Sequence, residues 1–189
     1  TSDSRTFAAH STSGTTPVPS QESRILMALN AEIYLLRHAT VEEESDLPNL
    51  DIPLSKVGER QANSLVDYLS SLNFDAIYTS PYRRARNTVL PLCENMGIVA
   101  KVRKGLGESA KDEELSEVGK RLTKVIHAIG REHPGGRILA CTHGGCMWGL
   151  IASFDESFGE KEYSKIKSPD VRRIIYTAGK PKLMDQLTF

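Results

Sequence analysis

The feature that most constrains the fold of this chain is a pair of apolar segments, far apart in sequence, that each end in a histidine. Residues 32–38 read Glu-Ile-Tyr-Leu-Leu-Arg-His, and residues 137–143 read Arg-Ile-Leu-Ala-Cys-Thr-His. Short continuous apolar runs are typical of strands that are buried on both faces of a parallel sheet. Because ligands of such sheets bind where the strands end, we expect His38 and His143 to line one crevice.

Further strands and amphipathic helices alternate along the chain. Apolar residues at helical spacing follow Ser55, a predicted N-cap, and recur in later segments. The predicted helices are 55–72, 82–96, 113–131 and 146–154, and the other predicted strands are 74–80, 98–102, 171–177 and 182–188. This alternation predicts an α/β fold, a three-layer sandwich with a mostly parallel central sheet flanked by helices.

The length of 189 residues fits one domain, which we place at residues 25–189. Residues 1–24 are rich in Ser and Thr and lack apolar periodicity, so we expect a disordered N-terminal tail or leader there. Arg5 and the scarcity of acids faintly resemble an organelle transit peptide. Organelle targeting by this tail is therefore an alternative to a cytoplasmic location.

Composition narrows the classes of partner. The chain has 24 basic and 24 acidic residues, so no global field favours nucleic acid or an anionic membrane. No apolar run approaches the roughly 20 residues that a membrane helix needs, so we expect a soluble protein without a membrane partner. The three cysteines form no disulfide framework, which favours a reducing, cytoplasmic compartment. Nothing in the sequence indicates an oligomeric state.

Cationic groups stand beside the predicted strand ends. Arg37 precedes His38, and Arg84 lies one turn into a helix, where the helix dipole disfavours a cation. Gly144 and Gly145 follow His143, so the backbone can approach a ligand closely and the next helix offers free N–H groups to an anion. Together these groups predict an anion-binding site.

A metal site is the alternative. Cys141, His143 and Cys146 are closely spaced, but a structural zinc site needs a second pair of ligands elsewhere, and the sequence offers none. We therefore expect no metal and no cofactor, with Cys141 and Cys146 as buried packing residues.

Four ordered motifs across residues 31–178 resemble the histidine phosphatase superfamily, which has the phosphoglycerate mutase-like fold. They are Arg37-His38-Ala39, the Pro-Leu-Ser segment 53–62, the Ser-Pro-x-x-Arg-Ala-x-x-Thr segment 80–88 and Thr142-His143-Gly144-Gly145. Ala39 replaces the usual glycine. After Leu106-Gly107-Glu108 the family's long insertion is almost absent, so this chain is either a compact member or lacks a loop near Glu108–Glu113.

The resemblance implies a metal-independent phosphatase of the histidine acid type. His38 would attack a phosphomonoester and form a phosphohistidine, and Glu108 would protonate the leaving oxygen. Arg37, Arg84, His143 and Gly144 would bind the phosphate, and His143 would also assist catalysis. The implied substrate is a phosphorylated small molecule or a phosphoprotein.

Two other functions remain open at this point. A phosphoglycerate-type mutase is disfavoured, because residues 40–44 differ from the signature that follows Arg-His-Gly in mutases and the closing insertion is missing. A non-catalytic module that binds phosphorylated ligands in the same pocket is the other alternative.

Overall fold

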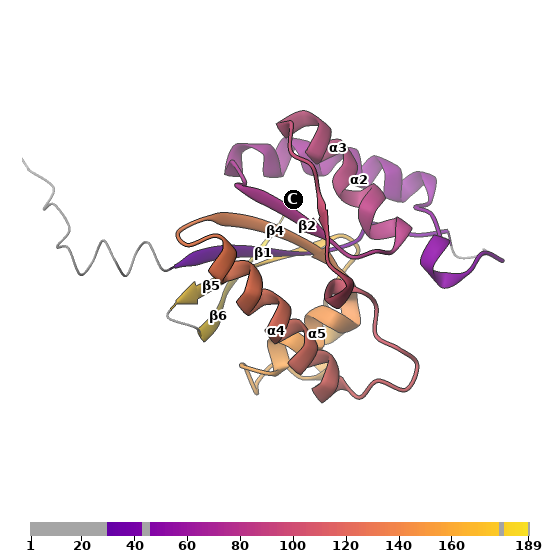
Figure 1. The fold of residues 1–189 in the computed structure, drawn as a ribbon. Helices are drawn as coiled ribbons and strands as arrows, with labels where there is room; N and C mark the ends of the chain where they lie inside the picture. Colours follow the sequence, from indigo (N-terminus) through magenta and orange to yellow (C-terminus); the bar gives the residue numbers. More distant parts are fainter. Residues whose placement is uncertain (1–29, 43–45, 178–179, 189) are drawn as a thin grey trace, which may run out of the picture.

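The computed structural model describes residues 30–42, 46–177 and 180–188, whose arrangement is shown in Figure 1. The predicted tail at residues 1–24 lies outside the described residues, as do residues 43 and 44 of the segment compared with the mutases. Within the described part, no helix is both long and apolar enough to cross a membrane.

One six-stranded sheet forms the centre of the molecule, in the order β3-β2-β4-β1-β5-β6. The first four of these strands run parallel, whereas β5 is antiparallel to both β1 and β6. The strands are β1 (Ala31–Arg37), β2 (Ala76–Thr79), β3 (Lys101–Val102), β4 (Arg137–Thr142), β5 (Asp170–Thr177) and β6 (Lys180–Leu187). The predicted α/β fold with a mostly parallel sheet is confirmed.

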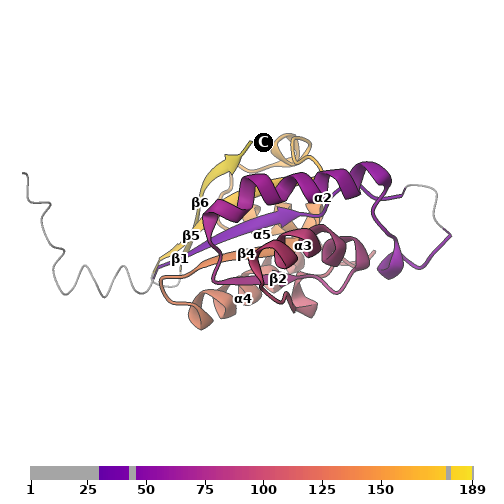
Figure 2. The same ribbon diagram turned by 90° about the horizontal axis from the view of Figure 1, so that it is seen from above.

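Helices cover both faces of the sheet, as Figures 1 and 2 show. Helices α2 (Lys56–Leu69) and α3 (Arg83–Met96) lie on one face, and α4 (Leu115–Glu132) and α5 (Gly144–Ala152) lie on the other. The short elements are α6 (Glu160–Tyr163) and the 3-10 turns η1 (Asn49–Asp51), η2 (Ser70–Leu72) and η3 (Lys104–Leu106). Ser55 caps α2 as predicted, since its hydroxyl accepts the N–H of Gly58 at 3.1 Å.

The three layers explain why β1 reads as a continuous apolar run. Successive side chains of a strand point to opposite faces. Ile33 and Leu35 therefore pack with α4 and α5, while Tyr34 and Leu36 pack with α2 and α3. Residues 33–36 of β1 are buried on both faces, so this stretch reads as a continuous run of apolar and aromatic side chains.

The parallel ladder between β1 and β4 continues past both strands and brings their ends together. Arg37 pairs with Thr142 in the sheet, and the next N–H, that of His38, donates to the Thr142 carbonyl at 3.1 Å. On the other side of β4, the Ser80 N–H donates to the Cys141 carbonyl at 3.0 Å. The residues that follow β1, β2 and β4 thus meet at one edge of the sheet.

Several boundaries differ from those expected. The predicted strand 98–102 is reduced to the two residues of β3, an exposed edge strand that pairs only with the end of the short β2. Helix α5 begins at Gly144 instead of Cys146; glycine has low helix propensity, but the first turn of a helix tolerates it. The prediction also missed η1 and α6, which are too short to show a helical period.

Candidate active site

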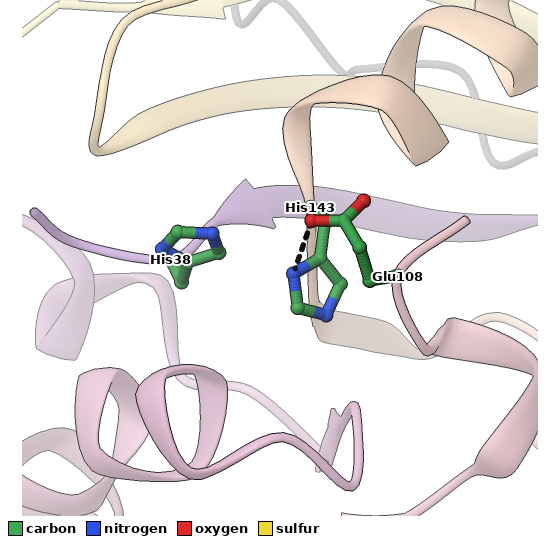
Figure 3. Close-up of side chains that lie close together, drawn as sticks. All are labelled: His38, Glu108 and His143. Atoms are coloured by element: carbon green, nitrogen blue, oxygen red, sulfur yellow. Dashed lines mark ion pairs between the residues drawn. The ribbon is translucent and has the colours of Figure 1, made fainter. Parts of the chain in front are cut away.

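Three side chains from separate parts of the chain converge at this edge of the sheet (Figure 3). His38 follows β1, His143 follows β4, and Glu108 follows η3. The ring centroids of His38 and His143 are 5.1 Å apart. Oε2 of Glu108 lies 3.2 Å from Nδ1 of His143.

His38 is held as a neutral imidazole with one free lone pair. Its Nδ1 is 2.8 Å from the Ala39 carbonyl oxygen. A carbonyl only accepts, so Nδ1 carries the proton and Nε2 is unprotonated. Burial lowers the pKa of His38 to about 3; the Ala39 carbonyl opposes this shift, and the nearby His143 and Arg84 add to it.

Side chains from three other segments fix the backbone around His38. The Ala39 N–H donates to the Thr88 hydroxyl at 2.9 Å, and the Ser168 hydroxyl donates to the His38 carbonyl at 2.6 Å. Gln61 in turn donates to the Ser168 carbonyl at 3.0 Å. These contacts restrict the position of the imidazole through the main chain.

Arg37 lies against the start of α5. Its Nη1 donates to the Ile166 carbonyl at 2.7 Å, while its buried Nε has no hydrogen-bond partner among the described residues. A Cβ atom at residue 144 would lie 3.1 Å from that Nε, which is tighter than usual contact distances. Gly144 therefore allows the guanidinium group to approach the first turn of the helix.

Arg84 is buried, with 4% of its surface exposed, whereas Arg83 is exposed. Its Nη1 donates to both the carbonyl (2.7 Å) and the side-chain oxygen (3.0 Å) of Asn49 in η1. Its Nη2 is 3.4 Å from Oε2 of Glu108, and its guanidinium carbon lies 4.6 Å from the ring centroid of Tyr82. Arg84 is therefore the arginine of α3 that faces the histidines.

Glu108 is ionised in this arrangement. Burial raises the pKa of its carboxyl, but contacts with His143, the Ser109 N–H and Arg84 outweigh burial and lower the pKa to about 2. The carboxylate thus contacts His143 and Arg84, two of the groups that the sequence predicts to bind an anion.

His143 is fully buried, and both of its ring nitrogens have polar neighbours. Nε2 lies 2.8 Å from the Ser80 hydroxyl, and Nδ1 faces Glu108. The Tyr82 ring packs edge-on against the imidazole, with centroids 4.9 Å apart. Burial lowers the pKa of His143, although the Glu108 carboxylate opposes this shift.

The arrangement fits an anion better than a cation. His38, Glu108 and His143 offer ligand atoms within 4.8 Å of one another, a spacing that a metal ion could use. Arg84 and Arg37 flank these atoms, however, and their fixed positive charges oppose a bound cation. Cys141 packs with α2 and α3 on the opposite face of the sheet from Cys146, so these two cysteines do not share an ion.

All six residues predicted for the site, Arg37, His38, Arg84, Glu108, His143 and Gly144, therefore lie at one edge of the sheet. Sequence reasoning missed the partners that hold them. Thr88 lies in the motif of segment 80–88 and Gln61 in that of segment 53–62, so their positions in these motifs could have indicated a role beside the site. Asn49 and Ser168 lie in loops without a motif, and only the tertiary structure reveals their contacts.

The chain is similar to known proteins in sequence and in fold. The family model of the histidine phosphatase superfamily (branch 1) matches residues 33–112 and 108–185. The two matched segments meet at residues 108–112, where the sequence analysis places the shortened insertion. The chain is 24% identical over 179 residues to the uncharacterized phosphatase PhoE of Bacillus subtilis (strain 168), covering 81% of this chain and 92% of that protein.

Solved structures share the fold. Phosphoserine phosphatase from Entamoeba histolytica, in complex with 3-phosphoglyceric acid, is 18% identical with a TM-score of 0.70, covering 84% of this chain and 98% of that one. The protein histidine phosphatase SixA, complexed with tungstate, is 15% identical with a TM-score of 0.67, covering 83% of this chain and 96% of that one.

Proposed function

This chain belongs to the histidine phosphatase superfamily, and from that premise we propose that it is a phosphatase that hydrolyses a phosphomonoester through a phosphohistidine on His38. The observation that carries the proposal is the state of His38. Its imidazole is neutral, and its Nδ1 proton is donated to the Ala39 carbonyl, so Nε2 keeps a free lone pair. The imidazole ring lies next to that of His143. A nucleophilic histidine requires this tautomer.

In the first step, Nε2 of His38 forms a bond to phosphorus as the bond from phosphorus to the leaving oxygen breaks. Arg37, Arg84 and His143 hold the other phosphate oxygens, with the Gly144 N–H at the start of α5. The planar guanidinium groups suit phosphate because they donate pairs of hydrogen bonds. Removal of one such donor typically lowers the rate by about 10²–10³-fold.

Glu108 is the proposed proton donor to the leaving oxygen. In the unliganded site its pKa is about 2, so the carboxyl is ionised there. A bound phosphate dianion would take over the contacts with His143 and Arg84, and its charge would raise the pKa of the carboxyl. In the second step the carboxylate accepts a proton from water, which attacks the phosphohistidine and releases inorganic phosphate.

For the substrate we propose a phosphorylated small molecule first and a phosphoprotein second. The Entamoeba histolytica relative is a phosphoserine phosphatase solved with phosphoserine, and the other relative is a protein histidine phosphatase. A panel of phosphoserine, 3-phosphoglycerate and a phosphohistidine peptide would rank these classes.

The test is hydrolysis of p-nitrophenyl phosphate, followed by trapping of the phosphoenzyme from a labelled ester by rapid quench in alkali. We expect release of inorganic phosphate by the wild type and loss of both turnover and label in His38→Ala. Label retained in His38→Ala would contradict the assignment of the nucleophile. Ligand binding without turnover would instead support a binding module, and an isomerised phosphoglycerate product would support a mutase.

A further inference from the structure

The loop that carries Glu108 is anchored by side chains outside the phosphate site. We define the acid loop as residues 105–113, which begins within η3 and ends just before α4. Its backbone lacks regular secondary structure after η3, so other groups must hold Glu108 in place. The most extensive of these contacts come from Arg121, in the second turn of α4.

Arg121 contacts the acid loop before Glu108. Its Nη1 donates to the carbonyl oxygens of Gly105 at 2.8 Å and of Gly107 at 3.0 Å. The Gly107 carbonyl belongs to the peptide that joins directly to Glu108. A shift of this carbonyl would therefore move the carboxylate relative to His143.

Arg121 also contacts the acid loop after Glu108, through Glu113. Its Nε and Nη2 each donate to one carboxylate oxygen of Glu113 at 2.7 Å, a two-pronged ion pair. Oε2 of Glu113 in turn accepts the Ala110 N–H at 3.2 Å. The side chain of Arg121 is 27% exposed and that of Glu113 is 18% exposed, so the pair is partly shielded from water.

Two further side chains donate hydrogen bonds to the backbone of the acid loop. The Thr142 hydroxyl donates to the Leu106 carbonyl at 2.7 Å, and the Cys146 thiol donates to the Gly107 carbonyl at 3.0 Å. Thr142 and Cys146 flank His143 in sequence. The acid loop is thus fixed to the same backbone that carries the partner of Glu108.

We propose that Arg121, with Glu113, is a positioning residue that sets Glu108 at the distance from the leaving oxygen needed for proton transfer. This inference rests on the proposed phosphatase function. A shift of about 1 Å in a catalytic group can lower a rate about 100-fold. Because a nitrophenolate leaves with little protonation, the effect should depend on the leaving group.

The experiment compares p-nitrophenyl phosphate with glycerol 2-phosphate, an alkyl ester whose leaving oxygen needs a proton. The variants are Arg121→Met and Glu113→Gln, with Lys124→Met as the control because Lys124 is an exposed cation on the same helix. We expect kcat/KM for the alkyl ester to fall about 10–100-fold, and kcat/KM for the aryl ester to fall less than about 3-fold. The ratio kcat/KM reports the transfer of the phosphoryl group to His38 and leaves out the later hydrolysis of the phosphohistidine, which both esters share. The control should match the wild type on both esters.

A double variant separates positioning from general stability. Glu108→Gln combined with Arg121→Met should be no slower on the alkyl ester than Glu108→Gln alone, because Arg121 would act through Glu108. Equal losses on both esters, no loss on either, or an additive loss in the double variant would overturn the inference while leaving the phosphatase function intact. Absence of turnover in the wild type would overturn both.

Discussion

Replacement of Thr88 by valine tests whether the backbone beside His38 depends on one buried hydroxyl. Thr88 is fully buried; its hydroxyl accepts the Ala39 N–H at 2.9 Å and donates to the Arg84 carbonyl at 2.7 Å. Valine keeps the shape of the side chain but leaves the Ala39 N–H without an acceptor. An unsatisfied buried donor costs about 1–3 kcal/mol. We therefore expect the free energy of unfolding to fall by about 2 kcal/mol.

The assay is thermal and urea denaturation at pH 7, followed by circular dichroism. A loss of about 2 kcal/mol corresponds to a Tm about 4–8 °C lower for a chain of this size. Thr88→Ser is the matched control, because it keeps the hydroxyl and removes one methyl group, at a cost of about 0.5–1.5 kcal/mol. If Thr88→Val proved as stable as Thr88→Ser, the hydrogen bond to Ala39 would not stabilise this loop.

Two further predictions concern the charged groups of the site. Arg84→Ala should lower kcat/KM about 10²–10³-fold, whereas Arg83→Ala should keep kcat/KM within a few-fold of the wild type. The reason is that, of these two arginines, Arg84 is buried beside the histidines and Arg83 is exposed. Equal losses of kcat/KM in steady-state assays would contradict this assignment. The pKa of His38 is about 3 in the folded protein and near 6.5 when exposed, so the unfolded chain binds the proton first as pH falls. Stability should therefore decrease from pH 6.5 toward pH 3, by as much as about 1.4 kcal/mol per pH unit from this group. Urea titrations between pH 7 and 5 should show a shallower slope for His38→Gln, and an unchanged slope would count against the buried neutral state.

The sequence predicted those parts of the site that depend on local pattern. The apolar run before Arg37 predicted a buried strand, and the resemblance of segment 80–88 to the family motif singled out Arg84, the arginine that the structure buries. The two histidines were expected together because parallel strands end at one edge.

Other contacts could not be predicted, because they depend on how distant loops approach each other. Asn49 contacts Arg84, and Ser168 contacts His38, from segments with neither periodicity nor a motif. The predicted start of α5, at Cys146, was wrong for a different reason: propensity disfavours glycine in helices, but Gly144 lies in the first turn of the helix, where glycine is tolerated. The contacts between Arg121 and the acid loop likewise depend on how α4 packs beside that loop.

The continuation of the ladder between β1 and β4 has a consequence for how this site can change. Adjacent strands lie about 4.8 Å apart whatever side chains they carry. The distance between the two imidazoles is therefore set by the main chain of β1 and β4 and not by the helices on either face of the sheet. Substitutions in the surrounding loops can therefore change the walls of the site while the two histidines keep their spacing, and under the proposed function a change of substrate needs no change in this pair.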